Sequence, residues 1–259
     1  MKCPIKLIFI GSGSAFTTHS GNYNSNMLLV DEENNEKLLI DCGSDARHAL
    51  AELNYSYKDI NSVYISHLHA DHAGGMEWFA LTHKFDPSEK DKPHLYGNKF
   101  IIKQLWEHSL QGGLSTIQSV KASLETFFHT HPVEPDGIFE WNGILFQTVQ
   151  TVHIVSNYSF MHSYGLIFTL GKTRIFITTD TQFAPNQLID FYQNVDLIFQ
   201  DCETLTNPSG VHANFKELVN LPPEIKAKIW LYHYNPGTLP DAEAAGFKGF
   251  VKKGQVFEF

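Results

Sequence analysis

The sequence predicts one α/β domain, residues 1–259, in which two β-sheets carry helices on their outer faces. Three observations lead to this fold class. The 259-residue chain is 42% hydrophobic, which suits a sizeable buried core. It contains no repeat, low-complexity tract or linker that would divide it into two domains. Short apolar segments that end in polar loops recur in both halves, and a largely helical insertion is expected between them, at about residues 77–135.

The first half is expected to supply one sheet. Its strands are short apolar segments, each followed by a polar turn: Ile5–Ile10, Ser25–Val30, Lys37–Ile40 and Ser62–Ile65. A helix from Ala46 to Leu53 is expected between the last two strands. The strand that ends at Ile65 leads directly into a cluster of histidines.

The second half repeats this pattern and is expected to supply the other sheet. Its strands are GILFQTVQTV, YGLIFTL and TRIFITTD joined by a Gly-Lys turn, VDLIFQD, and KIWLYH. The interval between the halves, Trp78 to Glu134, is expected to be largely helical and includes NKFIIKQLWEHSL. Each half therefore contributes one sheet and its own covering helices.

Charge and cysteine content exclude several classes of protein. The formal net charge of −9 disfavours electrostatic capture of a long nucleic acid. The apolar run near the start is too short for a secretory signal or a membrane span, so a cytoplasmic protein of a bacterium or an infected cell is expected, without membrane contact. Cys3, Cys42 and Cys202 are widely spaced, which favours buried or metal-neighbouring thiols over a disulfide framework.

The segment ISHLHADHAGG, which starts at Ile65, has the spacing of a metal site. Because side chains alternate along an extended chain, His67 and His69 are expected on the same side. Asp71 and His72 follow as the chain turns over two glycines, and they can face a second point nearby. Zinc takes imidazole nitrogen at ~2.0–2.1 Å, and two hydrolytic ions lie ~3.5–4 Å apart. The segment therefore predicts ligands for two cations.

With the motifs that follow other strands, the chain resembles the metallo-β-lactamase superfamily. The motifs are DCG at 41–43, SHLHADH at 66–72, TVH at 151–153, TTDT at 178–181 and LYH at 231–233. The resemblance implies an αββα sandwich of two mixed sheets, with the metal site at one edge between them. It implies that one ion is held by His67, His69 and His153 and the other by Asp71, His72 and His233. Asp180 would bridge both ions, and Asp41 would orient the ligand loop, although a simple turn residue is the alternative for Asp41.

The ligand types favour hydrolysis over redox chemistry. Imidazoles and carboxylates, with His at position 69 and Asp at position 180, suit a redox-silent pair of divalent ions. Zinc is expected, with manganese and iron as alternatives. A water shared by two such ions would have its pKa lowered from 15.7 toward ~7, which supplies a nucleophile at neutral pH. Asp71 is therefore counted among the catalytic residues as well as the ligands.

A later segment, FQDCETLTNPSGVHANFKEL, resembles the tRNase Z branch of this superfamily. There a carboxylate orients a histidine just before a helix, which implies that Asp201 holds His212 and that His212 protonates the leaving oxygen of a phosphodiester. A surface histidine at the start of a helix is the alternative for His212, and a carboxylate paired with a backbone donor alone is the alternative for Asp201. The long basic arm of tRNA-processing members is missing from this chain, and a small substrate is therefore expected.

Together with the opening GSGSAFT and NYNSNMLL, these features most resemble the anti-Pycsar phosphodiesterases. That resemblance implies hydrolysis of the cyclic pyrimidine mononucleotides cCMP and cUMP, which silences an antiviral signal. It also implies a homodimer, whose interface we expect at the aromatic residues Trp78, Phe79, Phe127 and Phe128, with simple helix packing as the alternative for these residues. A tRNase Z-like RNA 3′-processing endonuclease and a non-enzymatic, metal-stabilised protein that sequesters its ligand are the alternative functions.

Two polar segments are candidates for holding the nucleotide. Asn24 and Asn26 lie on a loop between the first strands, and Tyr158 and His162 follow His153. Amides and aromatic rings suit hydrogen bonding and stacking with a base and a ribose. An ordinary hairpin turn explains the asparagines equally well.

Overall fold

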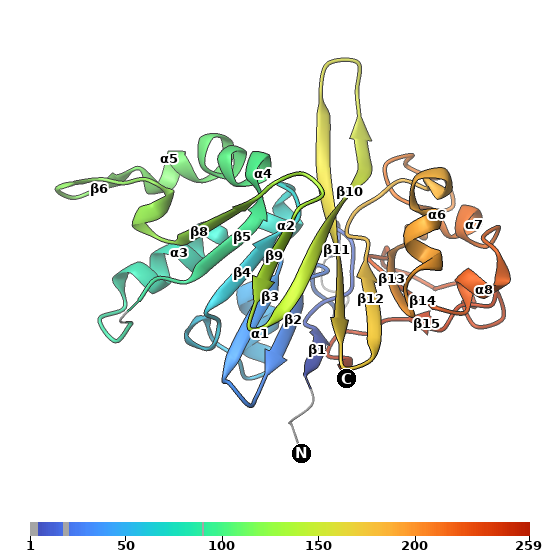
Figure 1. Ribbon diagram of the computed structural model, residues 1–259. Helices are drawn as coiled ribbons and strands as arrows, with labels where there is room; N and C mark the ends of the chain where they lie inside the picture. The colour runs from blue at the N-terminus through green and yellow to red at the C-terminus, as the bar shows by residue number, and fades with distance from the viewer. Residues whose placement is uncertain (1–4, 18–20, 90) are drawn as a thin grey trace.

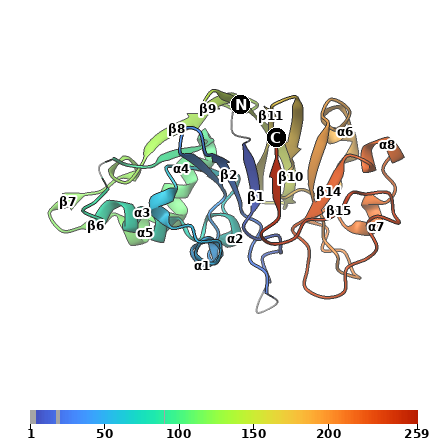
Figure 2. The same ribbon diagram turned by 90° about the horizontal axis from the view of Figure 1, so that it is seen from below.

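Two β-sheets face each other at the centre of the molecule, and helices cover their outer faces (Figures 1 and 2). The computed structural model describes residues 5–17, 21–89 and 91–259, so Cys3 lies outside the described residues. Within these residues each large sheet has seven strands. The last strand along the chain pairs with the first one that the structure describes.

The first sheet contains most strands of the amino-terminal half. Its order is β16 (Val256–Glu258), β1 (Lys6–Phe9), β2 (Met27–Asp31), β3 (Glu36–Ile40), β4 (Ser62–Ile65), β5 (His94–Asn98) and β8 (His129–Val133). Strands β1 to β3 are antiparallel neighbours, whereas β3, β4, β5 and β8 are parallel. One sheet per half is therefore confirmed, apart from the returning strand β16.

The second sheet mirrors this arrangement. Its order is β15 (Gly249–Phe250), β14 (Ile229–Tyr232), β13 (Leu197–Asp201), β12 (Thr173–Ile177), β11 (Phe160–Leu170), β10 (Ile144–Val155) and β9 (Ile138–Trp141). Strands β9 to β12 are antiparallel neighbours, and β12 to β15 are parallel. The long β10–β11 hairpin extends well beyond the rest of the sheet (Figure 1).

Helices pack on the outer face of each sheet. Over the first sheet lie α1 (Ala46–Glu52), η1 (Tyr57–Asp59), α2 (Ala70–Ala73), α3 (Met76–Phe85), α4 (Lys99–Gln104), the π-helix η2 (Leu105–Leu110), α5 (Gln111–Leu114) and η3 (Leu124–Thr126). Over the second lie α6 (Pro185–Gln193), α7 (Phe215–Leu218) and α8 (Pro223–Lys226). Among the residues that the structure describes, no helix is long and apolar enough to cross a bilayer.

Three layers of apolar side chains hold these four layers of secondary structure together. Strand β2 shows why its sequence is continuously apolar: Leu28 and Val30 pack toward the helices, whereas Met27 and Leu29 pack against the other sheet. The layer between the sheets is rich in aromatic rings, with Phe146 and Phe168 centred 4.7 Å apart. These buried layers fix the position of the strand ends that carry the polar site.

The expectation of a helical insertion at residues 77–135 is only partly correct. Helices α3, α4, η2 and α5 are present, but β5 and β8 also lie in this interval, and a small hairpin forms from β6 (Thr116–Ile117) and β7 (Val120–Lys121). The strands read HLYGN and HTHPV, which lack a clear apolar period. Pairing with the existing sheet therefore decides their conformation, and Pro132 is tolerated because β8 is an edge strand.

Candidate metal centre

The polar residues expected from the sequence meet at one edge between the two sheets. Asp41, His67 and Asp180 follow the carboxyl ends of β3, β4 and β12, and His233 follows the end of β14. These strands belong to the parallel part of each sheet, so their carboxyl ends share an edge. The motifs that are far apart in the sequence therefore converge in space.

His153 reaches the same edge by a different route. It lies within the long antiparallel strand β10, where the register with β11 shifts between Val152 and Ile154. Such a β-bulge re-aims a side chain that would otherwise follow the strand's alternation. The Nδ1 atom of His153 lies 2.9 Å from the carbonyl oxygen of Val211 and donates to it, which leaves Nε2 facing the other histidines.

One group of nitrogen atoms has the spacing of ligands around a single ion. His69 Nδ1 lies 3.2 Å from His67 Nε2 and 3.1 Å from His153 Nε2. Asp180 Oδ2 lies 3.5 Å from His67 Nε2 and 3.6 Å from His153 Nε2. Ligand atoms ~2.0 Å from a tetrahedral ion are ~3.3 Å from one another. These four residues therefore fit one divalent ion. A cation placed between them would accept the lone pair that each side chain directs toward the other three.

A second group lies on the other side of Asp180. His72 Nε2 is 3.2 Å from both Asp71 Oδ2 and Asp180 Oδ1, and His233 Nε2 is 3.2 Å from Asp71 Oδ2. Asp180 thus turns Oδ1 toward this group and Oδ2 toward the first. Among the described residues, His72 Nε2 and both oxygens of Asp180 are buried without a hydrogen-bond partner. Orphaned polar atoms of this kind fit a bridging carboxylate between two cations.

The electrostatics of this edge favour positive charge. Four carboxylates are almost fully buried there, namely those of Asp41, Asp71, Asp180 and Asp201. Their ion pairs in the described part of the chain are with histidines and not with Lys or Arg. Burial disfavours charge on His72, but the Asp180 and Asp71 carboxylates outweigh it and hold the pKa of His72 well above its usual value. Buried carboxylates require such compensation, and divalent cations supply it.

Removal of divalent ions is expected to destabilise the fold, because it leaves these carboxylates uncompensated. A ligand present at a free concentration of ~1,000 times its Kd stabilises the folded protein by ~4 kcal/mol. In a chain of this size, each kcal/mol of stability shifts Tm by ~2–4 °C. We therefore expect a chelator to lower Tm by about 10 °C in a calorimetric scan and zinc to restore it. An unchanged Tm after complete removal of metal would contradict the fit.

Asp41 holds two ligand residues in place. Its Oδ2 lies 2.8 Å from His72 Nδ1 and accepts from the Ser66 hydroxyl at 2.7 Å, and its Oδ1 accepts from the Ser66 backbone N–H. The Ser66 hydroxyl is in turn 3.0 Å from His67 Nδ1. Asp41 adopts a positive φ of 63°, as do Thr179 at 54° and His233 at 62°, so strained backbone gathers at this edge. Asp41 is therefore more than a turn residue.

The Asp41→Asn variant is expected to weaken metal binding without unfolding the protein. The amide keeps the shape of the carboxylate but loses the charge that aligns His72. Partners of this kind affect metal affinity by ~10–100-fold. Competition with a chromogenic chelator measures the loss, and the exposed pair of Lys6 and Glu32 offers a control in Glu32→Gln. An affinity equal to that of the wild type would show that Asp41 has no such role.

Asp201 and His212 lie together beside the metal ligands. His212 Nδ1 is 2.8 Å from Asp201 Oδ2, which also accepts from the Thr181 backbone N–H at 2.9 Å. Burial opposes protonation of His212, but the Asp201 carboxylate outweighs it and raises the pKa of His212 above its usual value. The expected pairing is therefore present in the structure, with His212 partly open to solvent.

Asp201 has a further contact that the sequence analysis does not anticipate. Its Oδ1 lies 3.2 Å from Nδ1 of the ligand His233. Asp201 thus hydrogen-bonds His212 and lies at ion-pair distance from His233. The parallel register of Asp201 opposite Tyr232 brings the two strand ends together, and that register is not visible in the sequence.

Two of the expected nucleotide contacts serve the ligand loops instead. Asn26 is fully buried, donates from Nδ2 to the Asp71 carbonyl oxygen at 2.9 Å and accepts from the Gly43 N–H at 2.7 Å. Gly43 is required there, since a Cβ atom would lie 2.1 Å from the Asp71 oxygen. Asn24 is also buried and donates to the Ser14 carbonyl oxygen. In this structure the amides of both asparagines bind backbone groups, and neither asparagine lines the cavity beside His212 and His233.

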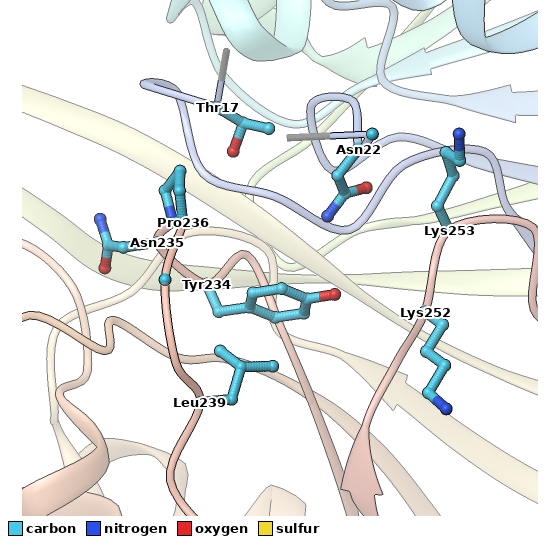
Figure 3. A pocket seen from close by; sticks show the side chains of 10 residues that line it. Thr17, Asn22, Tyr234, Asn235, Pro236, Leu239, Lys252 and Lys253 are labelled. Atoms are coloured by element: carbon cyan, nitrogen blue, oxygen red, sulfur yellow. The ribbon is translucent and has the colours of Figure 1, made fainter. Parts of the chain in front are cut away.

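The other two expected contacts lie away from the metal ligands within this chain. Tyr158 is 96% exposed between β10 and β11, and His162 Nδ1 is 2.9 Å from Gln150 Nε2. Neither side chain lines the small cavity that opens beside His212 and His233, of about 100 Å³. A second cavity, of about 350 Å³, is lined by Tyr234, Lys252, Lys253, Thr17 and Asn22 (Figure 3).

The aromatic segment expected at a dimer interface is mostly interior. Phe79, Phe127 and Phe128 are at most 1% exposed and pack in the core beneath the first sheet's helices, whereas Trp78 is half-buried. These phenylalanines cannot form an intersubunit surface in the folded chain. Cys42 and Cys202 are buried free thiols, as expected.

Solved structures of several proteins share this fold. The metallo-β-lactamase fold protein YhfI from Bacillus subtilis superposes with a TM-score of 0.74 at 21% identity, covering 99% of this chain and all of its own. A diphosphatase of the PhnP family gives 0.73 at 19% identity over 99% and 97% of the two chains. The short form of human tRNase Z gives 0.67 at 16% identity over 97% and 98%. The αββα metallo-β-lactamase sandwich expected from the sequence is thus confirmed.

Sequence relatives narrow the family. The anti-Pycsar protein Apyc1 of Paenibacillus harenae is 37% identical over 227 residues, which cover 87% of this chain and 88% of the relative. The protein of the same name from Bacillus phage 010DV004 is 30% identical over 99% of both chains. The family model for anti-Pycsar protein Apyc1 matches residues 5–257. This chain therefore belongs to the anti-Pycsar protein Apyc1 family.

Proposed function

We propose that this protein is a metal-dependent phosphodiesterase that hydrolyses 3′,5′-cyclic nucleotides, with cCMP and cUMP as its substrates. The observation that carries the proposal is the juxtaposition of the Asp201–His212 pair with a buried edge that fits two cations. Membership of the anti-Pycsar family supports a role in countering a cyclic-nucleotide antiviral signal. We propose that the enzyme works in the cytoplasm.

The proposed ligands follow from the two groups of side chains. One divalent ion is assigned to His67, His69 and His153 and the other to Asp71, His72 and His233, with Asp180 between them. A pair of zinc ions, when bound, supplies an activated water and neutralises charge on the phosphoryl group. Burial lowers the pKa of His67 well below its usual value, so this imidazole stays neutral and keeps its lone pair for a metal.

His212 is the proposed general acid. Asp201 accepts from Nδ1, so Nε2 is the free nitrogen that can serve the leaving O3′ of a cyclic nucleotide. The Asp201 carboxylate raises the pKa of His212 above its usual value, which favours the protonated form that a general acid requires. The adjoining cavity has a volume of about 100 Å³, a size that suits one part of a mononucleotide better than a folded RNA.

A homodimer is part of the proposal, and the tip of the β10–β11 hairpin is its proposed contact. Val155, Tyr158 and Phe160 expose 54%, 96% and 64% of their surface at this tip. Apolar side chains gathered on a projecting hairpin favour contact with another surface (Figure 1). Light scattering of the purified protein measures its mass and distinguishes a dimer from a monomer.

A panel of cyclic nucleotides, incubated with metal-replete protein and separated by chromatography, tests the proposed reaction. We expect linear CMP and UMP from cCMP and cUMP, and no product after chelation. Precursor tRNA incubated in parallel is expected to stay intact. Trimming of the tRNA trailer would favour an RNA-processing enzyme, and tight binding of cCMP without turnover would favour sequestration.

A further inference from the structure

We propose that the ring of Phe16 is a stacking platform for the base of the bound nucleotide and thereby sets the affinity for nucleotides. The inference rests on the proposed function, since it concerns the substrate of that same site. The observation that supports it is that the exposed ring of Phe16 lines the cavity beside His212 and His233.

The cavity has a polar side and an apolar side. His212 and His233 line it on the side of the metal centre, and Ala15, Phe16 and Leu205 also line it. Phe16 is 81% exposed and Leu205 is 44% exposed. Apolar side chains held open to water next to a catalytic edge are typical of a surface that a ligand covers.

The backbone fixes Phe16 relative to the ligand His233. The Thr17 N–H donates to the Ser14 carbonyl oxygen at 3.0 Å, so Phe16 lies in a tight turn. The Ser14 N–H donates to the carbonyl oxygen of Tyr234 at 3.0 Å, and the His233 N–H donates to that of Ser12 at 2.9 Å. The backbone of the turn is therefore attached to the segment that carries His233, which places Phe16 beside the metal centre before substrate arrives.

The residues that line the cavity beside His212 favour binding of a neutral planar ring over binding of a phosphate group. Glu203 is the acidic residue of this wall, and its carboxylate already accepts from the Ser209 N–H and from Asn214 Nδ2. Lys252 and Lys253 line the separate cavity that Thr17 faces, beyond Tyr234 (Figure 3). Adjacent residues of one turn thus face an apolar and a basic cavity. The apolar one adjoins His212, and aromatic rings stack with any base through its π-face.

Steady-state kinetics of three variants test this platform. Phe16→Ala is expected to raise KM for cCMP by roughly 5- to 150-fold with kcat nearly unchanged, because stacking acts on binding. Phe16→Tyr is expected to restore the wild-type KM. Phe85→Ala is the matched control, since Phe85 is 61% exposed at the end of α3 and does not line the cavity.

Product inhibition separates this inference from the proposed substrate. Hydrolysis of an activated aryl diester is measured with CMP and with ribose 5-phosphate as competitors. Phe16→Ala is expected to weaken inhibition by CMP by the same factor as KM and to leave inhibition by ribose 5-phosphate unchanged. Equal effects on both competitors, or none on either, would overturn the platform. If cCMP is not hydrolysed but inhibition by CMP depends on Phe16, the proposed substrate is wrong and the platform remains.

Discussion

Asp180→Ala is expected to abolish paired metal binding and to reduce kcat/KM by at least ~10³-fold. Asp180 directs one oxygen at each ligand group, at 3.2 Å from His72 Nε2 and 3.5 Å from His67 Nε2. Removing it takes away the only side chain shared by both groups in our assignment. Stabilisation of phosphoryl charge by metal contributes several kcal/mol, and each 1.36 kcal/mol is a factor of ten in rate.

Elemental analysis and kinetics of the same preparations give the result. The matched control is Asp190→Ala, which removes an exposed aspartate on α6 and is expected to keep both ions and full activity. The Asp180→Asn variant keeps the shape of the side chain and one of its two oxygen atoms. Circular dichroism shows whether each variant is folded. Two ions per chain in folded Asp180→Ala protein would show that the bridge has been assigned to the wrong residue.

His212→Ala is expected to slow hydrolysis of cCMP by ~10²–10⁴-fold while metal content stays intact, because general acid assistance to the leaving oxygen is lost. An alkoxide leaving group needs that proton, whereas a nitrophenolate leaves without it. Hydrolysis of bis(p-nitrophenyl) phosphate is therefore expected to change far less. The matched control is His108→Ala, since His108 is an exposed histidine in η2. Its rates on both substrates are expected to equal those of the wild type.

The ratio of the two rate losses identifies the role of His212. Equal losses on cCMP and on the aryl diester would mean that His212 stabilises charge or structure and does not donate a proton. Loss of metal from the variant would place His212 among the ligands. Its Nδ1 atom lies 3.9 Å from Oδ2 of the proposed ligand Asp180.

Most residues of the candidate metal centre could be predicted from the sequence because they come shortly after the end of an apolar strand. A strand end fixes the position of the next few residues, so His67, His69 and Asp71 are placed by local geometry alone. His153 is placed among the ligands by resemblance alone. The register shift that turns its side chain toward His67 and His69 is set by pairing with β11 and leaves no mark in the sequence around it.

Long-range contacts explain what could not be predicted. Asn26 reads as a surface residue, yet its amide joins Gly43 and Asp71, which are 17 and 45 residues away. Phe127 and Phe128 are expected at an interface between subunits, but they pack in the core with residues such as Phe79. Strands β5 and β8 carry His, Gly and Pro, so only their place in the sheet makes them extended.

Anomalous X-ray diffraction at the absorption edge of the bound metal tests the central claim most directly. We predict two peaks about 3.5–4 Å apart in crystals of active protein, one among His67, His69 and His153 and the other among Asp71, His72 and His233. A single peak, or peaks away from these side chains, in protein that still hydrolyses its substrate would contradict the account.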